Sequence, residues 1–368
     1  MFRFPLLLII FLVPITGFTA GISWLNVSHT GGVQVRENSS WNSRYFEYAP
    51  SAFLEGNYRY IFYCGNNQSG QIKDSIRLNK IGNQFKVTAF YFDKDVINTN
   101  GFGWDSKHIC DPSVIKGKFR YDNVNYKYAM FYTGSNDPYN NGTHNQIGLA
   151  FSNNLENWVK RPNPIIYKNC SGSNCWGVGQ PSVTSVDGKG QLLLFMTRGT
   201  PYETKMTVTH LDLSNLDTSI KTLKNEWNLT TNGLGLGING KSYHLAGADL
   251  LYDNDSDTFY MVWGSRFDEK MPNWISTELM VSSLKGSSMW SGYGAWTNLG
   301  TYQAEQERGR YQSKKAKTFD AGFDKNPYGN LPYKGSPLLM LNYSVSDSVG
   351  WPNSLWTYNI RRAFGYIF

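Results

Sequence analysis

A short phrase recurs in this sequence, and its spacing constrains the fold more than any other feature. Ala49-Pro50-Ser51, Asp111-Pro112-Ser113 and Gln180-Pro181-Ser182 each open a strand-like stretch, followed by a turn and an aromatic-rich stretch that ends in Gly. Ala248-Asp249-Leu250 opens a fourth, less similar copy. Successive starts lie 62 (111 − 49), 69 (180 − 111) and 68 (248 − 180) residues apart. A steady period of this size indicates repeated β-units, none of which buries its sheet alone.

The repeats predict an all-β fold, a five-bladed β-propeller of four-stranded antiparallel blades. Four copies extend from Ala49 to about Gly300, and Tyr302–Phe368 is long enough for a divergent fifth, with strands at Pro337–Tyr343 and Leu355–Ile360. The 15% aromatic content favours strands, and no sustained helical stripe of apolar residues is present. We expect Ile22–Val35 to complete the last blade and close the ring.

The first twenty residues read as an export signal, which leaves residues 21–368 as a single propeller domain. Arg3 supplies a positive start, Phe4–Ile15 an apolar core and Thr16–Ala20 an exit of mostly small residues. A retained membrane anchor is the alternative, although the apolar run is short for a membrane span. We therefore expect a secreted, extracellular or periplasmic protein without stable membrane insertion.

Four cysteines agree with an oxidising compartment. Cys170 and Cys175 are close enough for a local staple, and Cys64 and Cys110 would then join the end of one repeat to the start of the next. Four cysteines allow three pairings, of which we prefer this one. Zinc is not expected, because the spacing is wrong and the five histidines do not cluster beside the cysteines.

The net charge of +7 is mostly dispersed. The one basic cluster consists of Arg308, Arg310, Lys314, Lys315 and Lys317. It is either a solvated loop or a contact surface for an acidic polymer such as a charged polysaccharide. No nucleic-acid partner is expected for an exported chain without a binding motif. We expect a monomer.

The second repeat contains short motifs similar to those of a known family. The segments, in order, are Trp104-Asp105-Ser106, Asp111–Ile115, Met130–Gly134, Ile147–Ser152 and Asn157-Trp158. In these motifs the sequence resembles the five-bladed β-propeller glycosidases, which include arabinanases, β-xylosidases and invertase-like fructosidases. The resemblance implies that the residue opening each blade points into a central pocket. It also implies three carboxylates there: an Asp base on the first blade, an orienting Asp on the second and a Glu acid on the third.

This sequence keeps one of those three carboxylates. Asp111 matches the orienting residue, whereas Ala49 stands in place of the base and Gln180, or Gly179 under a one-residue shift, in place of the acid. Alanine has no proton chemistry, and glutamine forms hydrogen bonds without serving as a general acid or base. The mechanism that the resemblance implies is therefore not carried over unchanged.

Other carboxylates are candidates to replace the missing two. Glu47 lies two residues before Ala49 and shares its strand face, and Asp105 lies in the loop that leads to Asp111. Asp249 follows the fourth opening residue, and a one-residue change of register would turn it inward. We therefore predict Asp111, Asp249 and Glu47 as the catalytic set, with Asp324 as a candidate opener of the fifth blade.

The predicted substrate-binding residues are Gln180, Arg198, Arg266, Trp104, Asp105 and Trp176. Arg198 and Arg266 both follow their openers by eighteen residues, and two guanidinium forks suit a carboxylate or sulfate on a sugar. The alternative is that each anchors a loop or pairs with an acid. Trp104 and Trp176 offer flat faces for sugar stacking, with blade packing as the alternative.

Two functions follow from these observations. The first is glycoside hydrolysis in a poly- or oligosaccharide; the alternative is a lectin-like propeller that has lost its acid and base but still binds carbohydrate. No cofactor is expected, and axial calcium is implied only by the resemblance, because no sequence motif supplies its oxygen ligands. His108 and His244 are interpreted as structural. A second carboxyl group within about 10 Å of Asp111 would favour the enzyme.

Overall fold

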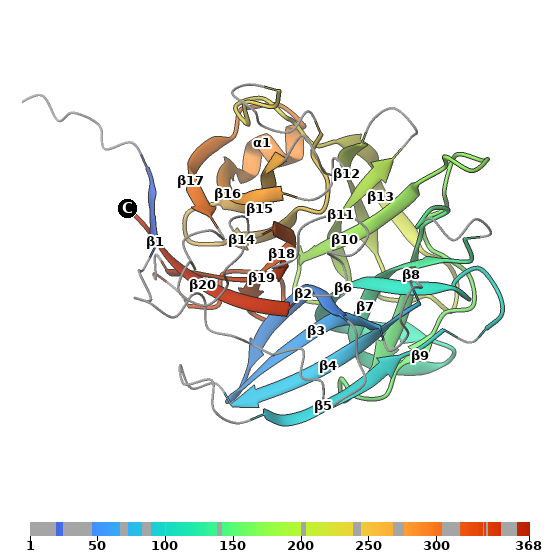
Figure 1. The fold of residues 1–368 in the computed structure, drawn as a ribbon. Helices are drawn as coiled ribbons and strands as arrows, with labels where there is room; N and C mark the ends of the chain where they lie inside the picture. Colours follow the sequence, from blue (N-terminus) through green and yellow to red (C-terminus); the bar gives the residue numbers. More distant parts are fainter. Residues whose placement is uncertain are drawn as a thin grey trace, which may run out of the picture.

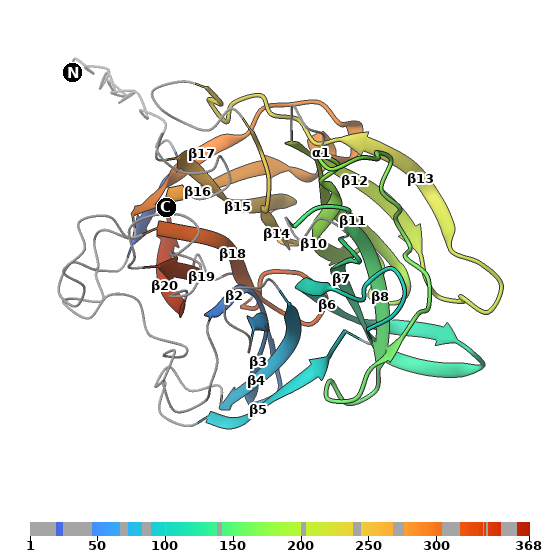
Figure 2. The ribbon, with the colours of Figure 1, turned by 45° about the vertical axis from the view of Figure 1, so that its right-hand side comes forward.

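The twenty strands of the described residues form five antiparallel groups of four, numbered here as blades 1 to 5 in chain order. Short additional pairings of β18 with β16 and with β2 connect blades 4, 5 and 1 into one larger sheet. The computed structural model describes residues 20–24, 46–66, 73–82, 90–99, 101–137, 142–199, 204–237, 244–267, 276–303, 317–333, 335, 338–346 and 359–368. Figures 1 and 2 show the groups arranged around a centre, with the first strand of each group innermost. The all-β propeller prediction is confirmed.

Each blade is a short antiparallel sheet of strands that follow one another in the chain. Blade 1 consists of β2 (Phe46–Glu55), β3 (Tyr58–Asn66), β4 (Asp74–Gly82) and β5 (Phe90–Ile97). Blade 2 consists of β6 (His108–Tyr121), β7 (Val124–Ser135), β8 (Gln146–Ser152) and β9 (Val159–Lys160). Blade 3 consists of β10 (Gly177–Ser185), β11 (Gln191–Gly199), β12 (Thr204–Asp212) and β13 (Lys221–Asn228).

The last two blades depart slightly from that pattern. Blade 4 consists of β14 (Asp249–Asp253), β15 (Thr258–Phe267), β16 (Ser276–Lys285) and β17 (Thr297–Gln303), with the short helix α1 (Gly286–Ser291) between β16 and β17. Blade 5 consists of β18 (Lys317–Lys325), β19 (Leu338–Ser346), β20 (Asn359–Ile367) and β1 (Ile22–Trp24). Because β1 pairs with β20, the predicted closure by the N-terminal segment is confirmed for residues 22–24; the rest of Ile22–Val35 lies outside the described residues.

The hydrophobic core is divided among the five joints between adjacent blades. Each of five buried clusters contains side chains of two neighbouring blades: Phe62 with Met130, Phe131 with Leu194, Phe195 with Met261, Val281 with Leu341, and Ile61 with Ile360. A blade buried on both faces reads as a nearly continuous apolar run rather than an alternation. The fully buried strand β8 shows this pattern. The last cluster joins blade 5 to blade 1 and so closes the ring.

The opening strands share an uncommon backbone conformation. Ala49, Asp111, Gln180 and Asp320 have φ values of 51°, 48°, 52° and 36°, and Gly247 has 60°. For a residue with a Cβ this left-handed region costs about 1–2 kcal/mol, so it marks positions held by their surroundings. We call these five residues the hub positions. They correct two predictions: blade 4 opens at Gly247 rather than Ala248, and blade 5 opens at Asp320 rather than Asp324.

A repeated hydrogen bond holds four of the hub positions. The amide of each hub residue donates to a side chain on the second strand of the preceding blade: Ala49 to Oγ of Ser344 (3.1 Å), Asp111 to Sγ of Cys64 (3.0 Å), Gln180 to Oγ1 of Thr133 (2.7 Å) and Gly247 to Oγ1 of Thr197 (3.0 Å). The strand register places Gly264 at the fifth such position, where no side chain is available. Blades 4 and 5 are joined there by pairing of Ser276 with Thr318 instead.

Both predicted disulfides are present. Cys64–Cys110 links blade 1 to blade 2, and Cys170–Cys175 closes a local loop. Among the described residues, no helix is long and apolar enough to cross a membrane.

Candidate functional site

The hub positions bring two carboxyl groups and one amide to the innermost strands. Asp111 opens blade 2, Gln180 opens blade 3 and Asp320 opens blade 5, whereas Ala49 and Gly247 contribute at most a methyl group. The three polar side chains are half-buried. The structure thus places a second carboxyl group, Asp320, at the position of blade 5 that is equivalent to Asp111. Asp320 was not among the predicted residues.

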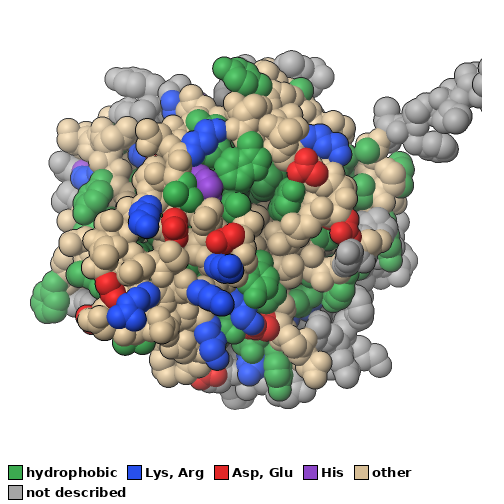
Figure 3. Space-filling view, turned by 180° about the vertical axis from the view of Figure 1, so that it is seen from behind, with side chains coloured by type: hydrophobic (Ala, Val, Ile, Leu, Met, Phe, Trp, Pro, Cys, Tyr) green, Lys and Arg blue, Asp and Glu red, His purple; other side chains and the backbone are tan. Residues whose placement is uncertain are grey.

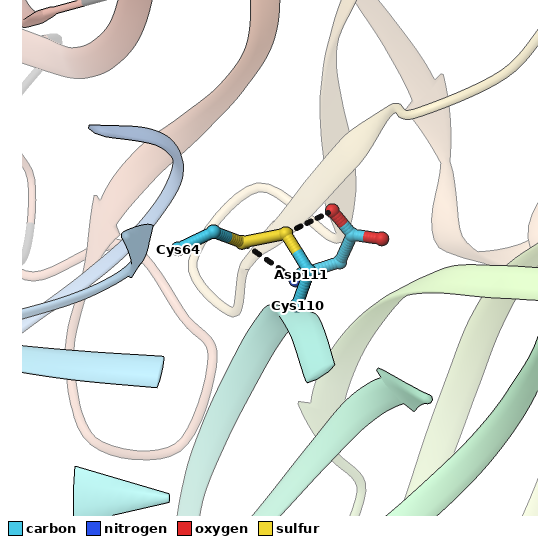
Figure 4. A group of neighbouring side chains, drawn as sticks. All are labelled: Cys64, Cys110 and Asp111. Carbon is cyan, nitrogen blue, oxygen red and sulfur yellow. Dashed lines mark hydrogen bonds between the residues drawn. A yellow bond between two sulfur atoms is a disulfide. The ribbon is translucent and has the colours of Figure 1, made fainter. Parts of the chain in front are cut away.

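Asp111 is fixed from several sides. Its amide donates to Sγ of Cys64, and its Oδ1 lies 3.4 Å from Sγ of Cys110 (Figure 4). Burial raises the pKa of the Asp111 carboxyl, while the nearby charge of His108 and the Thr133 hydroxyl oppose that rise. The result is a pKa raised above the ordinary value, with a cationic group and a donor that still favour the charged form.

Asp320 has a different environment at the same backbone position. Its Oδ1 accepts a long hydrogen bond of 3.4 Å from Nε2 of Gln180. A Cβ at Gly247 would lie 2.4 Å from that same oxygen, so the glycine leaves the space that this carboxyl occupies. The other oxygen, Oδ2, is buried without a hydrogen-bond partner among the described residues. Burial, and then the charge of Asp111, raise the pKa of Asp320 well above its ordinary value.

The charge of Asp111 is one of the causes that raise the pKa of Asp320. Like charges close together disfavour the second ionisation. The surroundings of the two groups differ: His108 and Thr133 lower the pKa of Asp111, and no such cationic influence acts on Asp320 among the described residues. The pKa of Asp320 is therefore raised further than that of Asp111, and two carboxyl groups whose pKa values are pushed apart are candidates for an acid and a base.

Asp249 was predicted as a catalytic partner, and the structure places it in a contact between blades. Its Oδ1 accepts from the Ser182 hydroxyl (2.7 Å) and pairs with the Lys325 ammonium (2.5 Å), and its Oδ2 accepts from the amide of Phe323 (2.8 Å). Asp249 lies two residues after the hub position Gly247, just as Ser113 and Ser182 lie two residues after the hub positions Asp111 and Gln180. Ser113 and Ser182 likewise accept amides of the next blade, from Val183 and Leu250. This register, rather than the proposed inward turn, sets the direction of Asp249.

Glu47 and Asp324 are both buried in blade contacts. Glu47 pairs with Gly65 in the β2–β3 ladder and is 2% exposed. Asp324 forms an ion pair of 2.7 Å with Nε of Arg59 and accepts from Nδ2 of Asn342. Its neighbours Arg59 and Arg362 lower its pKa, so it is an ionised structural group that joins blade 5 to blade 1. As the opener of blade 5, Asp324 is thus replaced by Asp320.

The remaining predicted binding residues lie mainly in contacts within the blades. Arg198 forms two hydrogen bonds with Glu226, one of them from Nη2 to Oε2 at 2.6 Å. It therefore pairs with an acid, as the alternative interpretation predicted. Asp105 pairs with Lys160 (2.8 Å) and accepts from the Tyr132 hydroxyl (3.0 Å). The Arg266 backbone lies in β15, and its side chain is outside the described part.

The two tryptophans pack within their blades. Trp104 stacks on Tyr132 with ring centroids 5.8 Å apart and donates its indole N–H to the carbonyl of Pro162. A Cβ at Gly199 would lie 2.8 Å from the Trp176 ring, so that ring covers the strand end. Both rings remain half-buried. Their use in sugar stacking stays a prediction.

Two clusters of metal-ligand residue types lie near Asp111, and both include a disulfide sulfur. Cys64, Cys110 and Asp111 form one, and Asp74, His108 and Cys110 the other. A disulfide sulfur carries no thiolate charge, so neither cluster offers a thiolate ligand while the Cys64–Cys110 bond is intact. The predicted basic cluster lies outside the described residues except for the backbone of Lys317, and the face in Figure 3 shows basic and acidic side chains close to one another.

Neither a family model nor a curated protein matches the sequence. Solved structures do match the fold. The catalytic domain of a GH62 α-L-arabinofuranosidase from Coprinopsis cinerea has a TM-score of 0.57 at 11% identity, over 94% of this chain and 97% of that one. The endo-arabinase from Bacteroides thetaiotaomicron VPI-5482 has a TM-score of 0.51 at 15% identity, over 93% and 98%. The family 117 glycoside hydrolase Zg3597 from Zobellia galactanivorans has a TM-score of 0.53 at 10% identity, over 95% and 90%. This chain therefore has the β-propeller fold of glycoside hydrolases.

Proposed function

We propose that this protein hydrolyses glycosidic bonds in a poly- or oligosaccharide, with Asp111 and Asp320 as its two catalytic carboxyl groups. The observation that carries the proposal is their placement at equivalent hub positions of blades 2 and 5, where the charge of one raises the pKa of the other. Asp111, not Asp320, has a cation among the groups that lower its pKa. Glycoside hydrolysis needs such a pair, one to protonate the leaving oxygen and one to act on water or the sugar carbon.

In this assignment Asp320 is the general acid and Asp111 the base or nucleophile. Asp320 holds its proton above the pH at which an ordinary aspartic acid loses it, because burial and Asp111 raise its pKa well above normal. Asp111 has to be ionised, so activity falls on the acid side as Asp111 is protonated. It falls on the alkaline side as Asp320 loses its proton. The expected profile is a bell with its acid limb set mainly by Asp111.

The solved structures with this fold suggest which sugars to test first. They include an α-L-arabinofuranosidase from Podospora anserina crystallised with cellotriose, and an endo-arabinase. Branched arabinan, arabinoxylan and cello-oligosaccharides are therefore the first substrates for the purified protein, with product release followed by chromatography and the product anomer by NMR. Inversion indicates carboxyl groups about 6.5–9.5 Å apart, and retention about 5–5.5 Å. Wild-type protein that releases no product from a broad glycan panel contradicts the proposal.

A carbohydrate-binding protein without turnover is the second candidate. Ala49 and Gln180 favour it, because these hub positions carry no proton-exchanging group. Isothermal titration with the same glycans separates the two functions. Binding without product release, unaffected by Asp320→Asn, indicates a lectin-like propeller.

We also propose that the protein is exported and acts as a monomer outside the cytoplasm. Residues 1–20 have the pattern of an export signal, and two disulfides suit an oxidising compartment. Fractionation of expressing cells with N-terminal sequencing of the mature chain tests export, and sedimentation tests the oligomeric state.

A further inference from the structure

A buried chain of polar side chains lies near Asp111, and the proposed chemistry does not itself use it. Sγ of Cys110 connects the two: it lies 3.4 Å from Oδ1 of Asp111 and within 4.8 Å of the nearest ligand atoms of Asp74 and His108. The hydroxyl of Tyr48 donates to Oδ2 of Asp74 at 2.5 Å. Nδ1 of His108 lies 2.9 Å from that same oxygen, at ion-pair distance. These three residues come from β2, β4 and β6, so the chain crosses from blade 1 to blade 2.

The position of this chain ties it to the hub. Tyr48 immediately precedes the hub residue Ala49, and His108 lies three residues before Asp111 on the same strand. The Cys64–Cys110 disulfide fastens the same joint. Tyr48 and Asp74 are almost fully buried, and the His108 side chain is 13% exposed. Close packing of the surrounding strands restricts the movement of these side chains.

We propose that Tyr48, Asp74 and His108 form a charge-holding relay that keeps the Asp111 carboxyl ionised, with His108 as the positioning residue that supplies the positive charge. This inference rests on the proposed function, since it explains why Asp111 rather than Asp320 is the ionised member of the pair. Asp74 holds His108 as an imidazolium, and the imidazolium in turn favours the Asp111 carboxylate. Tyr48 fixes the Asp74 carboxylate by its hydrogen bond.

The charges around His108 agree with this order. Burial alone disfavours the imidazolium, yet the pKa of His108 is raised, by Asp74 first and then by Asp111 and Asp137. Asp74 on β4, Asp111 on β6 and Asp137 after β7 are thus the acidic groups that act on the ring. His108 is in turn the strongest influence lowering the pKa of Asp111. Asp74 raises the pKa of Asp111, so the relay works through His108 and against the direct effect of Asp74.

The test is a carboxyl titration that needs no substrate. Full-length protein labelled with ¹³Cγ-aspartate is titrated by NMR, and the Asp111 signal is assigned by its loss in Asp111→Asn. His108→Gln removes the charge and keeps a polar side chain. We expect the midpoint of Asp111 to rise by about one pH unit, at the low end of what a neighbouring opposite charge provides. His210→Gln is the matched control: His210 is a half-buried histidine of blade 3, and Asp111 is not among the groups that shift its pKa.

Two further variants separate charge from packing. Asp74→Asn should lower the midpoint of the His108 ring, followed through its proton signals, because the carboxylate that holds the imidazolium is gone. Its effect on Asp111 should be smaller than that of His108→Gln, since the repulsion from Asp74 disappears at the same time. Tyr48→Phe keeps the charge of Asp74 and should not lower the His108 midpoint. A folded His108→Gln protein with an unchanged Asp111 midpoint overturns the inference, as does a His108 midpoint that Asp74→Asn leaves in place.

Kinetics then distinguish failure of this inference from failure of the proposed function. If the wild-type protein turns over branched arabinan, the acid limb of kcat/KM should move to higher pH in His108→Gln, and the limb should stay in place in His210→Gln. A lower kcat with an unmoved limb shows a merely structural histidine and overturns the relay. A shifted Asp111 midpoint in a protein without turnover supports the relay and contradicts hydrolysis.

Discussion

Asp111 and Asp320 occupy the same position in two blades, yet the molecule treats them in opposite ways. The amide of Asp111 bonds to the preceding blade, a disulfide lies beside its carboxyl, and His108 and Thr133 favour its charge. Asp320 follows a blade that offers Gly264 at the corresponding position, and one of its oxygens has no hydrogen-bond partner among the described residues. A single backbone position repeated around the ring therefore presents two carboxyl groups whose pKa values are raised to different extents, because the neighbouring blades differ.

The comparison teaches that the repeat sets where a side chain points, while the joints between blades set its chemistry. The hub conformation is shared by all five blades. The acceptor for the hub amide is a hydroxyl at three joints and a sulfur at a fourth. Divergence of the joints is therefore enough to give equivalent positions different pKa shifts.

The largest expected effect comes from removing the ionised member. Asp111→Asn keeps the size of the side chain and removes the base, so kcat should fall by about 10³-fold or more. Sugar affinity, measured by titration calorimetry, should change only a few-fold. A variant that retains more than a tenth of the wild-type kcat on the same glycan would mean that Asp111 is not the base.

Removing the protonated member should give a loss that depends on the leaving group. In Asp320→Asn, kcat on a natural glycan should fall by about 10²–10³-fold, because its leaving oxygen needs a proton. An aryl glycoside with an acidic phenol leaves without that proton and should lose about tenfold at most. Steady-state rates on the two substrates test this. Equal losses on both substrates would remove the acid role from Asp320, and Asp111→Asn should show equal losses.

The Cys64–Cys110 disulfide, which lies beside Asp111, should stabilise the fold more than Cys170–Cys175. Cys64–Cys110 closes a loop with a sequence separation of 46, and Cys170–Cys175 one with a separation of 5. Chain entropy predicts stabilisation of about 4 kcal/mol for the first and about 2 kcal/mol for the second. Chemical unfolding of the paired Cys→Ser variants should show that order. Cys64→Ser with Cys110→Ser should also lower activity more than the other pair, since only this bond adjoins Asp111.

The smallest expected effect concerns the space that Asp320 occupies. Gly247→Ala places a methyl group 2.4 Å from Oδ1 of Asp320 at a φ of 60°. Gly56→Ala has nearly the same backbone strain, with a φ of 57° and nothing within 4 Å, and is the matched control. Both should lose about 1–2 kcal/mol of unfolding free energy, and only Gly247→Ala should also lose activity. If the control loses as much activity, backbone strain rather than the Asp320 contact is responsible.

The sequence predicted the architecture well, because the architecture follows from repetition. The Pro-Ser motif after Ala49, Asp111 and Gln180 marked three hub positions. Cys64 and Cys110 lie at the end of one repeat and the start of the next, which made their disulfide predictable. The Cδ of proline clashes with the backbone of the preceding residue and disfavours the right-handed helical region there, so each phrase argued against a helix. It did not predict the left-handed conformation of the hub residues.

Asp320 could not be predicted in the same way. The Pro-Ser motif that marks the other three openings is missing from blades 4 and 5. Asp320 is followed by Ala321 and Gly322, and Gly247 is followed by Ala248. Position alone was a signal: Asp320 lies 73 residues after Gly247 (320 − 247), nearer to the earlier spacings than Asp324 at 77 (324 − 247). The pairing of Asp249 with Lys325 was likewise invisible, because it depends on two blades meeting.

The seam of the ring has a consequence for the order in which the protein is made. Blade 5 combines β18 to β20 with β1, so strands from opposite ends of the described chain must meet before the final sheet is whole. Asp320 belongs to that blade. A nascent polypeptide can thus complete blades 1 to 3 before Asp320 has been synthesised, so the proposed carboxyl pair can form only once the last blade is made.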